Sequence, residues 1–360
     1  MKYIEEYRDP VLCETLLNQI HKEIREEIVI MEVCGGHTMA LHRFGIPALL
    51  PKQIRLLSGP GCPVCVTGRG YIDKAIRLAR SGNVTICTYG DLIRVPGSQG
   101  SLEKAAADGG DIKVVFSPLQ CLEQAKQNPS REFVFLGIGF ETTAPASAVA
   151  IAKASEASLK NFFLFSAHKL MPPAMAAIIH EGIRVDGYLC PGHVSTIAGT
   201  EMYQPLVRNF GVGCVIAGFE PVDLLQAVLM LVRQHQQGKQ QVEIQYSRAV
   251  KPEGNPKARK LVSMVFKPGD AWWRGLGMLE ESGLNIRDQF MAHDASVVYG
   301  LPEEETGDPK GCRCGDVLKG LIKPDECSLY HKVCNPGNPV GACMVSAEGA
   351  CQTWYQYVRS

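Results

Sequence analysis

Two cysteine motifs near the start of the chain have the residue types and spacing for metal or redox chemistry. The first is Cys34-Gly-Gly-His37 and the second is Cys62-Pro-Val-Cys65. A C-x-x-C spacing closes readily into a disulfide and lowers the pKa of the attacking thiol. The alternative is that the two cysteines bind zinc. A four-thiolate zinc site would need a second C-x-x-C, which the sequence lacks. The spacing therefore favours thiol redox exchange.

Both motifs directly follow apolar runs that read as strands. The first apolar run, residues 28–33, is followed by Cys34. The second, residues 54–58, is followed by the turn Gly59-Pro-Gly-Cys62. Ligand sites in open α/β sheets lie beyond the carboxyl ends of the strands. We therefore expect one crevice to hold Cys34, His37 and the Cys62/Cys65 pair. The alternative for Cys34 is a small buried hydrophobic side chain.

A second group of cysteines lies in the segment 307–360, which is rich in Gly and Pro. Its members are Cys312, Cys314, Cys327, Cys334, Cys343 and Cys351. A loop-rich region without a core of its own is often held together by a metal centre, and irregular gaps favour an iron-sulfur cluster over the paired knuckles of zinc. One cubane cluster needs four thiolates, so two of the six cysteines remain. In the C-x-C pair Cys312 and Cys314, one sulfur can bind the cluster while the other belongs to an adjacent dithiol.

Composition narrows the function classes. Lys plus Arg and Asp plus Glu are both 37 in 360 residues, and no basic block suggests nucleic acid or an anionic membrane as a partner. The opening sequence MKYIEEYRDP is not a secretory signal, and no apolar run is long enough to span a bilayer. We expect a cytoplasmic protein, in which 14 cysteines indicate metal, redox or nucleophilic chemistry rather than a disulfide framework.

The elements that must position these residues alternate between strand and helix. A helix should begin at Asp9-Pro10, and apolar strands then alternate with helices from residue 28 to about 235. This pattern predicts an α/β protein with two parallel-sheet βαβ domains and a loop-rich C-terminal iron-sulfur domain. The expected divisions are an N-terminal helix packed on another domain (1–27), a first α/β domain with Cys34 and the Cys62/Cys65 loop (28–129), a second α/β domain (130–247) and the cluster domain (248–360).

A nucleotide site is a weaker possibility. Gly137-Ile-Gly139-Phe-Glu-Thr142 follows a strand, as a dinucleotide fingerprint would, but its third glycine is replaced by Thr142. The chain also has no G-x-x-x-x-G-K-[ST] motif. Nucleotide binding is therefore disfavoured.

The motifs taken in order resemble those of the HypD family of hydrogenase maturation factors, over essentially the whole chain. The matching segments are Cys34-Gly-Gly-His37, Gly59-Pro-Gly-Cys-Pro-Val-Cys65, Gly139-Phe-Glu-Thr-Thr-Ala-Pro145, Ser166-Ala-His-Lys-Leu-Met-Pro-Pro173, Cys190-Pro-Gly-His-Val-Ser195, Gly218-Phe-Glu-Pro-Val-Asp223 and the segment from Asn335 to Cys351.

The resemblance implies a function as an assembly scaffold rather than a conventional turnover enzyme. In this family, the protein and a small HypC-type partner hold the iron that receives cyanide and carbon monoxide, giving an Fe(CN)₂CO unit for [NiFe]-hydrogenase. A HypE-type protein is the expected cyanide donor. Cys34 would be a thiolate ligand of this iron. His37 and His193 would each be either a donor beside it or a structural residue.

The resemblance also implies one [4Fe-4S] cluster. Its ligands would correspond to Cys312, Cys327, Cys334 and Cys351, with Cys314 and Cys343 as a neighbouring redox pair, although spacing alone would equally allow Cys343 as a ligand. Together with Cys62 and Cys65, this pair would carry electrons to the iron at Cys34. The alternative is a ferredoxin-linked thiol-disulfide reductase acting on a protein substrate, with Cys34 incidental, and a zinc-stabilised binding module is a third reading.

Overall fold

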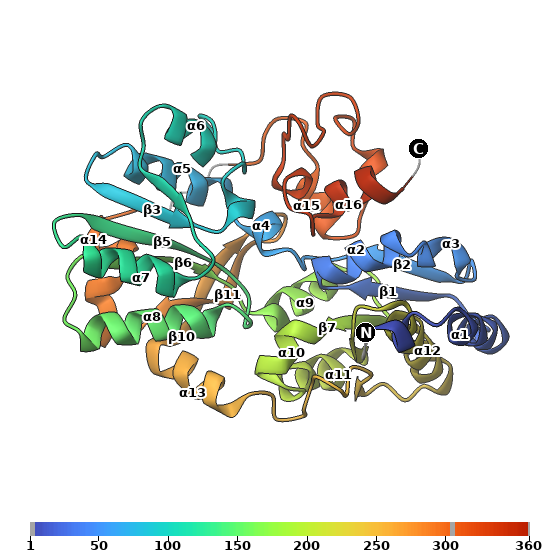
Figure 1. Ribbon diagram of the computed structural model, residues 1–360. Coiled ribbons are helices and arrows are strands. Elements are labelled where there is room, and N and C mark those ends of the chain that lie inside the picture. The colour runs from blue at the N-terminus through green and yellow to red at the C-terminus, as the bar shows by residue number, and fades with distance from the viewer. Residues whose placement is uncertain (1–3, 303–306, 359–360) are drawn as a thin grey trace.

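The computed structural model of the chain describes residues 4–302 and 307–358. The strands in these ranges form two parallel sheets and one antiparallel hairpin (Figure 1). The last part of the chain, from residue 307, is loop-rich and contains the six clustered cysteines. The predicted α/β class with parallel sheets and a loop-rich C-terminal region is confirmed.

Sheet A has the strand order β2-β1-β7-β8-β9, and all its neighbouring strands are parallel. Its strands are β1 (Ile28–Glu32), β2 (Ile54–Ser58), β7 (Gly187–Pro191), β8 (Gly213–Ala217) and β9 (Val242–Ile244). The central strands are buried along their whole length, as expected for a parallel sheet covered on both faces.

Sheet B has the strand order β4-β3-β5-β6 and is also parallel throughout. Its strands are β3 (Val84–Thr88), β4 (Ile112–Val114), β5 (Glu132–Gly139) and β6 (Phe162–His168). An antiparallel hairpin of β10 (Phe266–Trp273) and β11 (Gly277–Ile286) lies along β6, where the Leu170 amide bonds the Ser282 oxygen at 2.8 Å.

The strands are not divided between the sheets at residue 130, as the expected domain limits required. Sheet A takes β1 and β2 from the start of the chain and β7 to β9 from beyond residue 186, whereas sheet B is formed by the strands between residues 84 and 168. The chain leaves sheet A after β2 and returns to it at β7. Periodicity can locate a strand but not its neighbours in the sheet, so the sequence pattern could not reveal this crossover.

Helices cover both faces of sheet A. One face packs against α1 (Pro10–Glu23), α2 (Gly35–Arg43), α3 (Ile46–Leu49) and α12 (Pro221–Gln237), and the other packs against α9 (Met171–His180), α10 (Gly192–Ala198) and α11 (Gln204–Phe210). Helix α1 begins as predicted, because Asp9 Oδ1 accepts from the amides of Val11 (2.8 Å) and Leu12 (3.1 Å). It packs against α12.

Sheet B has its own covering helices. These are α5 (Arg69–Ala79), α6 (Leu102–Ala107), α7 (Pro118–Gln127), α8 (Ala144–Glu156), α13 (Pro256–Val265) and α14 (Ala295–Val298). Helix α13 packs on α8, and α14 packs on β6. Residues 256–298 thus extend the sheet B unit, which corrects the expected cluster domain of 248–360. The Pro- and Gly-containing segment Lys251–Pro256 is the point where the chain returns to sheet B, and a new domain does not begin there.

The tail is the part of the described chain from residue 307 to residue 358. It contains two short helices, α15 (Cys314–Leu318) and α16 (Ala350–Tyr357), joined by turns and 3-10 segments that include η5 (Pro324–Glu326) and η6 (Ala342–Met344). Figure 1 shows the tail in red above α2 and α4 (Pro63–Val66). Within the described residues, no helix combines the length and the apolar character needed to cross a bilayer.

Candidate functional site

Cys34 lies where β1 ends and α2 begins. Strand β1 lies between β2 and β7 in sheet A. The chain leaves β1 toward β2 and leaves β7 toward β8, so the two connections run in opposite directions from this point. Such a reversal of strand order creates a crevice at the carboxyl ends of the strands, where open α/β sheets bind their ligands. The Cys34 side chain is half-buried there. The predicted position of this thiol at a strand end is confirmed.

The surroundings of Cys34 disfavour its thiolate. Burial raises the pKa of the Cys34 thiol to about 12, and the nearby Glu348 carboxylate raises it further by charge repulsion. The thiol is therefore protonated at neutral pH. A metal ion that binds this sulfur must displace the proton, so binding at Cys34 is coupled to proton release.

The two predicted histidines lie on opposite sides of Phe219, which follows β8. The His37 ring centroid is 4.8 Å from that of Phe219, and the His193 centroid stacks at 4.2 Å. His37 is fully buried, its Nε2 lies 3.1 Å from the Ala217 oxygen, and burial lowers its pKa to about 4. His37 is thus a neutral imidazole with Nε2 bonded to the backbone, and its Nδ1 has no hydrogen-bond partner among the described residues. The exposed His193 is the more accessible of the two.

Gly61, immediately before the Cys62/Cys65 motif, packs against the backbone of Cys34. Cys62 and Cys65 form a disulfide and are both buried (3% and 0% exposed). The Gly35 amide donates to the Gly61 oxygen at 3.1 Å, and any Cβ at Gly61 would overlap the Cys34 backbone. A glycine is therefore required beside the motif for the two loops to meet. The two predicted motifs therefore lie side by side, beyond the carboxyl ends of β1 and β2.

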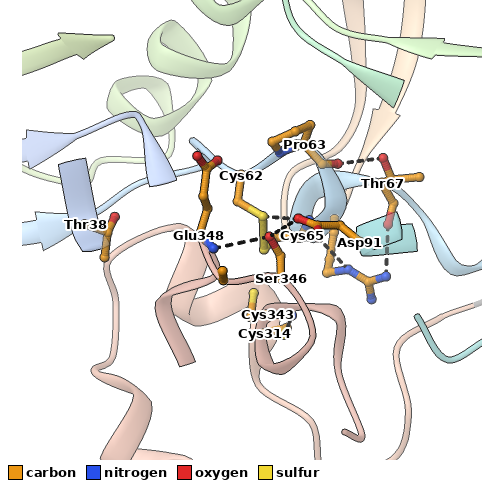
Figure 2. Close-up of a disulfide and its surroundings, with 12 residues drawn as sticks. Thr38, Cys62, Pro63, Cys65, Thr67, Asp91, Cys314, Cys343, Ser346 and Glu348 are labelled. Atoms are coloured by element: carbon orange, nitrogen blue, oxygen red, sulfur yellow. Dashed lines mark hydrogen bonds between the residues drawn. A yellow bond between two sulfur atoms is a disulfide. The ribbon is translucent and has the colours of Figure 1, made fainter. Parts of the chain in front are cut away.

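The tail folds back onto this crevice. Figure 2 shows Cys314 and Cys343 next to the Cys62–Cys65 disulfide, and α4 contacts both α15 and η6. Ser346 Oγ lies 3.3 Å from Asp91 Oδ2, at the carboxyl end of β3, and accepts from the Glu348 amide at 3.3 Å. Glu348 itself packs against Gly35, where a Cβ would meet its side chain at 2.6 Å. The tail therefore contacts the carboxyl ends of strands from both sheets.

A buried arginine holds the tail and the Cys62/Cys65 loop together. Arg274, in the turn between β10 and β11, is only 2% exposed. Its guanidinium donates to the oxygens of Cys65 (2.8 Å) and Thr67 (3.0 Å) and pairs with Asp308 at the start of the tail. Its amide also bonds the Val66 oxygen at 2.9 Å. A buried cation with these partners fixes the loop relative to the tail.

The tail cysteines surround a small enclosed cavity. Five of the six line it, namely Cys312, Cys314, Cys327, Cys334 and Cys351. Cys343 is not in the lining, but its amide donates to Cys314 Sγ at 3.4 Å. Gly341 leaves space for two of these sulfurs, because a Cβ there would lie 2.6 Å from Cys312 Sγ and 2.8 Å from Cys314 Sγ. Five thiols in one lining, beside apolar residues such as Val317 and Leu329, fit the ligand chemistry of an iron-sulfur cluster.

Charge at this cavity is also suited to a metal centre. A hydrogen bond from Cys314 lowers the pKa of Cys312 to about 6, with a further contribution from the Arg274 cation. Cys312 is therefore the tail thiol that ionises most readily among those whose pKa is shifted. Within residues 4–302 and 307–358, no three His, Cys, Asp or Glu side chains converge closely enough to hold a single metal ion.

Several residues of this site were not singled out from the sequence. Glu348 lies within a matched motif, but nothing in its spacing predicts contact with Cys34. Asp91 and Arg274 carry no motif, and their roles arise only when the tail packs on α4. Gly137 and Gly139 of the incomplete dinucleotide fingerprint pack against His168 and Thr143, respectively. Both glycines thus make close contacts within sheet B.

Comparison with known proteins gives full-length matches. The family model described as "HypD: Hydrogenase formation hypA family" matches residues 11–358. Hydrogenase maturation factor HypD of Azotobacter vinelandii is 46% identical over 369 residues, covering 100% of this chain and 97% of the relative. HypD2 of Bradyrhizobium diazoefficiens is 46% identical over 370 residues with the same coverage. HypD of Escherichia coli K12 is 41% identical over 366 residues, covering 99% and 98% of the two chains.

Proposed function

Because the chain belongs to the HypD family of hydrogenase maturation factors, we propose that Cys34 holds the iron atom on which the Fe(CN)₂CO unit of [NiFe]-hydrogenase is assembled. A HypC-type partner contributes a second thiolate, and a HypE-type protein delivers cyanide. The single observation that supports this role best is the meeting of three parts at Cys34. These are the sheet A crevice, the Cys62–Cys65 disulfide and the tail.

In this proposal, the residues around Cys34 prepare it to receive iron. The Cys34 thiol gives up its proton as iron binds, and Glu348, whose own pKa is raised by burial, is the carboxylate whose charge acts most strongly on that thiol. His193 is placed to donate a hydrogen bond to a ligand in the crevice. His37 orients the same wall through Phe219.

The tail is proposed to hold one [4Fe-4S] cluster through Cys312, Cys327, Cys334 and Cys351, which all line the thiol cavity. When bound, that cluster would supply electrons one at a time. Cys314 and Cys343 are left as the dithiol that faces the Cys62–Cys65 disulfide. In an exchange between the pairs, two electrons and two protons pass to Cys62 and Cys65, and a Cys314–Cys343 disulfide forms.

The alternative function, reduction of a disulfide in another protein, is less well supported. Cys62 and Cys65 are 3% and 0% exposed, and the tail covers them. A thiol that attacks a protein substrate must reach the substrate's sulfur. Buried sulfurs suit exchange within the molecule, between the tail and the loop at Cys34.

The experiment that tests the proposed function is hydrogenase maturation in cells that lack their own HypD. Cys62→Ser should block maturation while leaving the iron content of the tail unchanged, because only the disulfide nearest Cys34 is removed. Cys13→Ser, at a thiol on α1 far along the chain from these motifs, is the matched control and should mature hydrogenase normally. Normal maturation by both Cys62→Ser and Cys65→Ser would show that no dithiol relay operates.

A further inference from the structure

The outer edge of sheet A lies in a groove on the surface of the molecule. Among the described residues, strand β2 pairs with β1 only, so its other edge has no neighbouring strand there. The groove along it has a volume of about 970 Å³. Exposed strand edges are usually shortened, covered or blocked by proline, because their free peptide groups pair readily with other chains.

The register shows which peptide groups of β2 are free. The Ile28 amide bonds the Gln53 oxygen at 2.9 Å, and the Gly59 amide bonds the Glu32 oxygen at 2.8 Å. In a parallel ladder, alternate residues bond the same neighbour. Odd-numbered residues of β2 therefore face β1, and the amides of Leu56 and Ser58 face the groove. Neither amide has a hydrogen-bond partner among the described residues.

The groove has walls where an added strand would need them. On one face of the sheet, it is lined by α2 and α3 through residues such as Leu41 and Pro47. On the other face, it is lined by the tail around Gly320 and Leu321, and Trp354 of the tail contacts His42 of α2, with ring centroids 5.3 Å apart. A further strand beside β2 would thus be covered on both faces, as the inner strands of sheet A already are.

The charge of the groove indicates the kind of strand that fits. Lys52 and Arg55 are exposed along the β2 edge without a carboxylate partner in the described structure, and Lys323 stands on the tail wall. Glu326 on the same wall and Glu27 are the exposed carboxylates of the groove lining, and Arg184, which pairs with Asp186, is a further exposed cation there. An extended segment with acidic residues, and apolar residues between them, matches this lining.

We propose that an extended, acidic segment of the HypC-type partner adds to sheet A as a sixth strand, beside β2. This inference rests on the proposed function, because it assigns that function's partner to a surface. The groove reaches Glu32 and Ser58, immediately before the Cys34 and Cys62 loops. A segment paired with β2 therefore brings the partner to the crevice that holds Cys34.

Hydrogen exchange with the purified chain and its HypC-type partner tests this docking. The peptide spanning residues 52–60 should exchange more slowly in the complex than in the free chain, because the Leu56 and Ser58 amides gain partners. A complex that forms without slower exchange in this peptide overturns the docking site and leaves the proposed function standing. Failure of the two proteins to bind at all overturns both.

A pair of substitutions separates backbone pairing from side-chain contact. Leu56→Pro removes the outward amide, at an edge position that proline can occupy, and Leu56→Ala removes the side chain but keeps the amide. We expect binding to weaken about tenfold more for Leu56→Pro than for Leu56→Ala. Equal binding by the two variants would contradict strand addition. Iron content and thermal unfolding of both variants establish that each is folded.

Discussion

At Cys34, two features of the protein oppose ionisation of the very thiol that is proposed to bind iron. Burial has the larger effect on its pKa, and the Glu348 carboxylate adds to it. A protonated thiol is a poor nucleophile and a poor metal ligand. The free protein is therefore protected from oxidation at Cys34, and the site becomes a ligand only when a bound cation replaces the proton.

This reasoning predicts the effect of Glu348→Gln. Removing the carboxylate charge should lower the pKa of Cys34, so a larger fraction is thiolate at any pH below that value. Each unit of lowering raises the thiolate fraction about tenfold. Alkylation of the Cys34 peptide by iodoacetamide at pH 9, followed by mass spectrometry, should accordingly be faster in the variant. Glu123→Gln, on the surface of α7, is the control, and equal rates in all three proteins would exclude a role for the Glu348 charge.

At the scale of elements, the position of the tail depends on Arg274. Its substitution by Met leaves Asp308 and the oxygens of Cys65 and Thr67 without their buried partner. Losing one partner of a buried pair costs about 3–5 kcal/mol of stability. Urea unfolding should show this loss, and proteolysis of the tail should become faster. Arg80→Met breaks an exposed pair with Asp108 and should cost less than about 1 kcal/mol. Similar costs for the two variants would contradict the role given to Arg274.

The tail itself makes a separate prediction about metal content. Anaerobically purified protein should carry about four iron atoms and four sulfides per chain. Cys327→Ala should lose this iron and destabilise the tail, because turns and short helices provide little apolar core of their own. Cys13→Ala should keep it. Stoichiometric zinc without inorganic sulfide would contradict an iron-sulfur centre.

The elements were more predictable from the sequence than their arrangement. The strands Ile54–Ser58 and Gly213–Ala217 and the start of α1 at Asp9 follow directly from apolar runs and capping residues. The hairpin of β10 and β11 was not predicted, because glycine, proline and charged residues interrupt its apolar positions. The pairing of β1 with β7 was also beyond a local pattern, because these strands are joined only through sheet B.

The site shows the same limit. The positions of Cys34 and the Cys62/Cys65 pair after two strands could be predicted, because strand ends follow from local sequence. Glu348 and Arg274 could not be assigned in this way, because their contacts join residues that are hundreds of positions apart or lie on a folded-back tail. Exchange between the Cys314/Cys343 pair and the Cys62/Cys65 pair requires the tail to reach the Cys62 loop, and α15 and η6 of the tail contact α4 in the structure.

At the scale of the whole molecule, two sheets with interleaved strands support one crevice. The chain passes from sheet A to sheet B through the Cys62/Cys65 loop and returns through α9, so this loop lies between the two units. The tail then closes over it, contacting Asp91 beyond β3 and Gly35 beyond β1. A thiol, a disulfide and a thiol-lined cavity therefore occur together at Cys34, although their cysteines span most of the sequence.

The most direct test of this account is infrared spectroscopy of the chain purified anaerobically with its HypC-type partner. The account predicts bands of metal-bound cyanide and carbon monoxide in the wild-type complex and in Cys13→Ala. It predicts no such bands in Cys34→Ala, which should still fold, retain its tail iron and bind the partner. Cyanide and carbon monoxide bands of normal intensity in Cys34→Ala would contradict the central claim that Cys34 holds the iron.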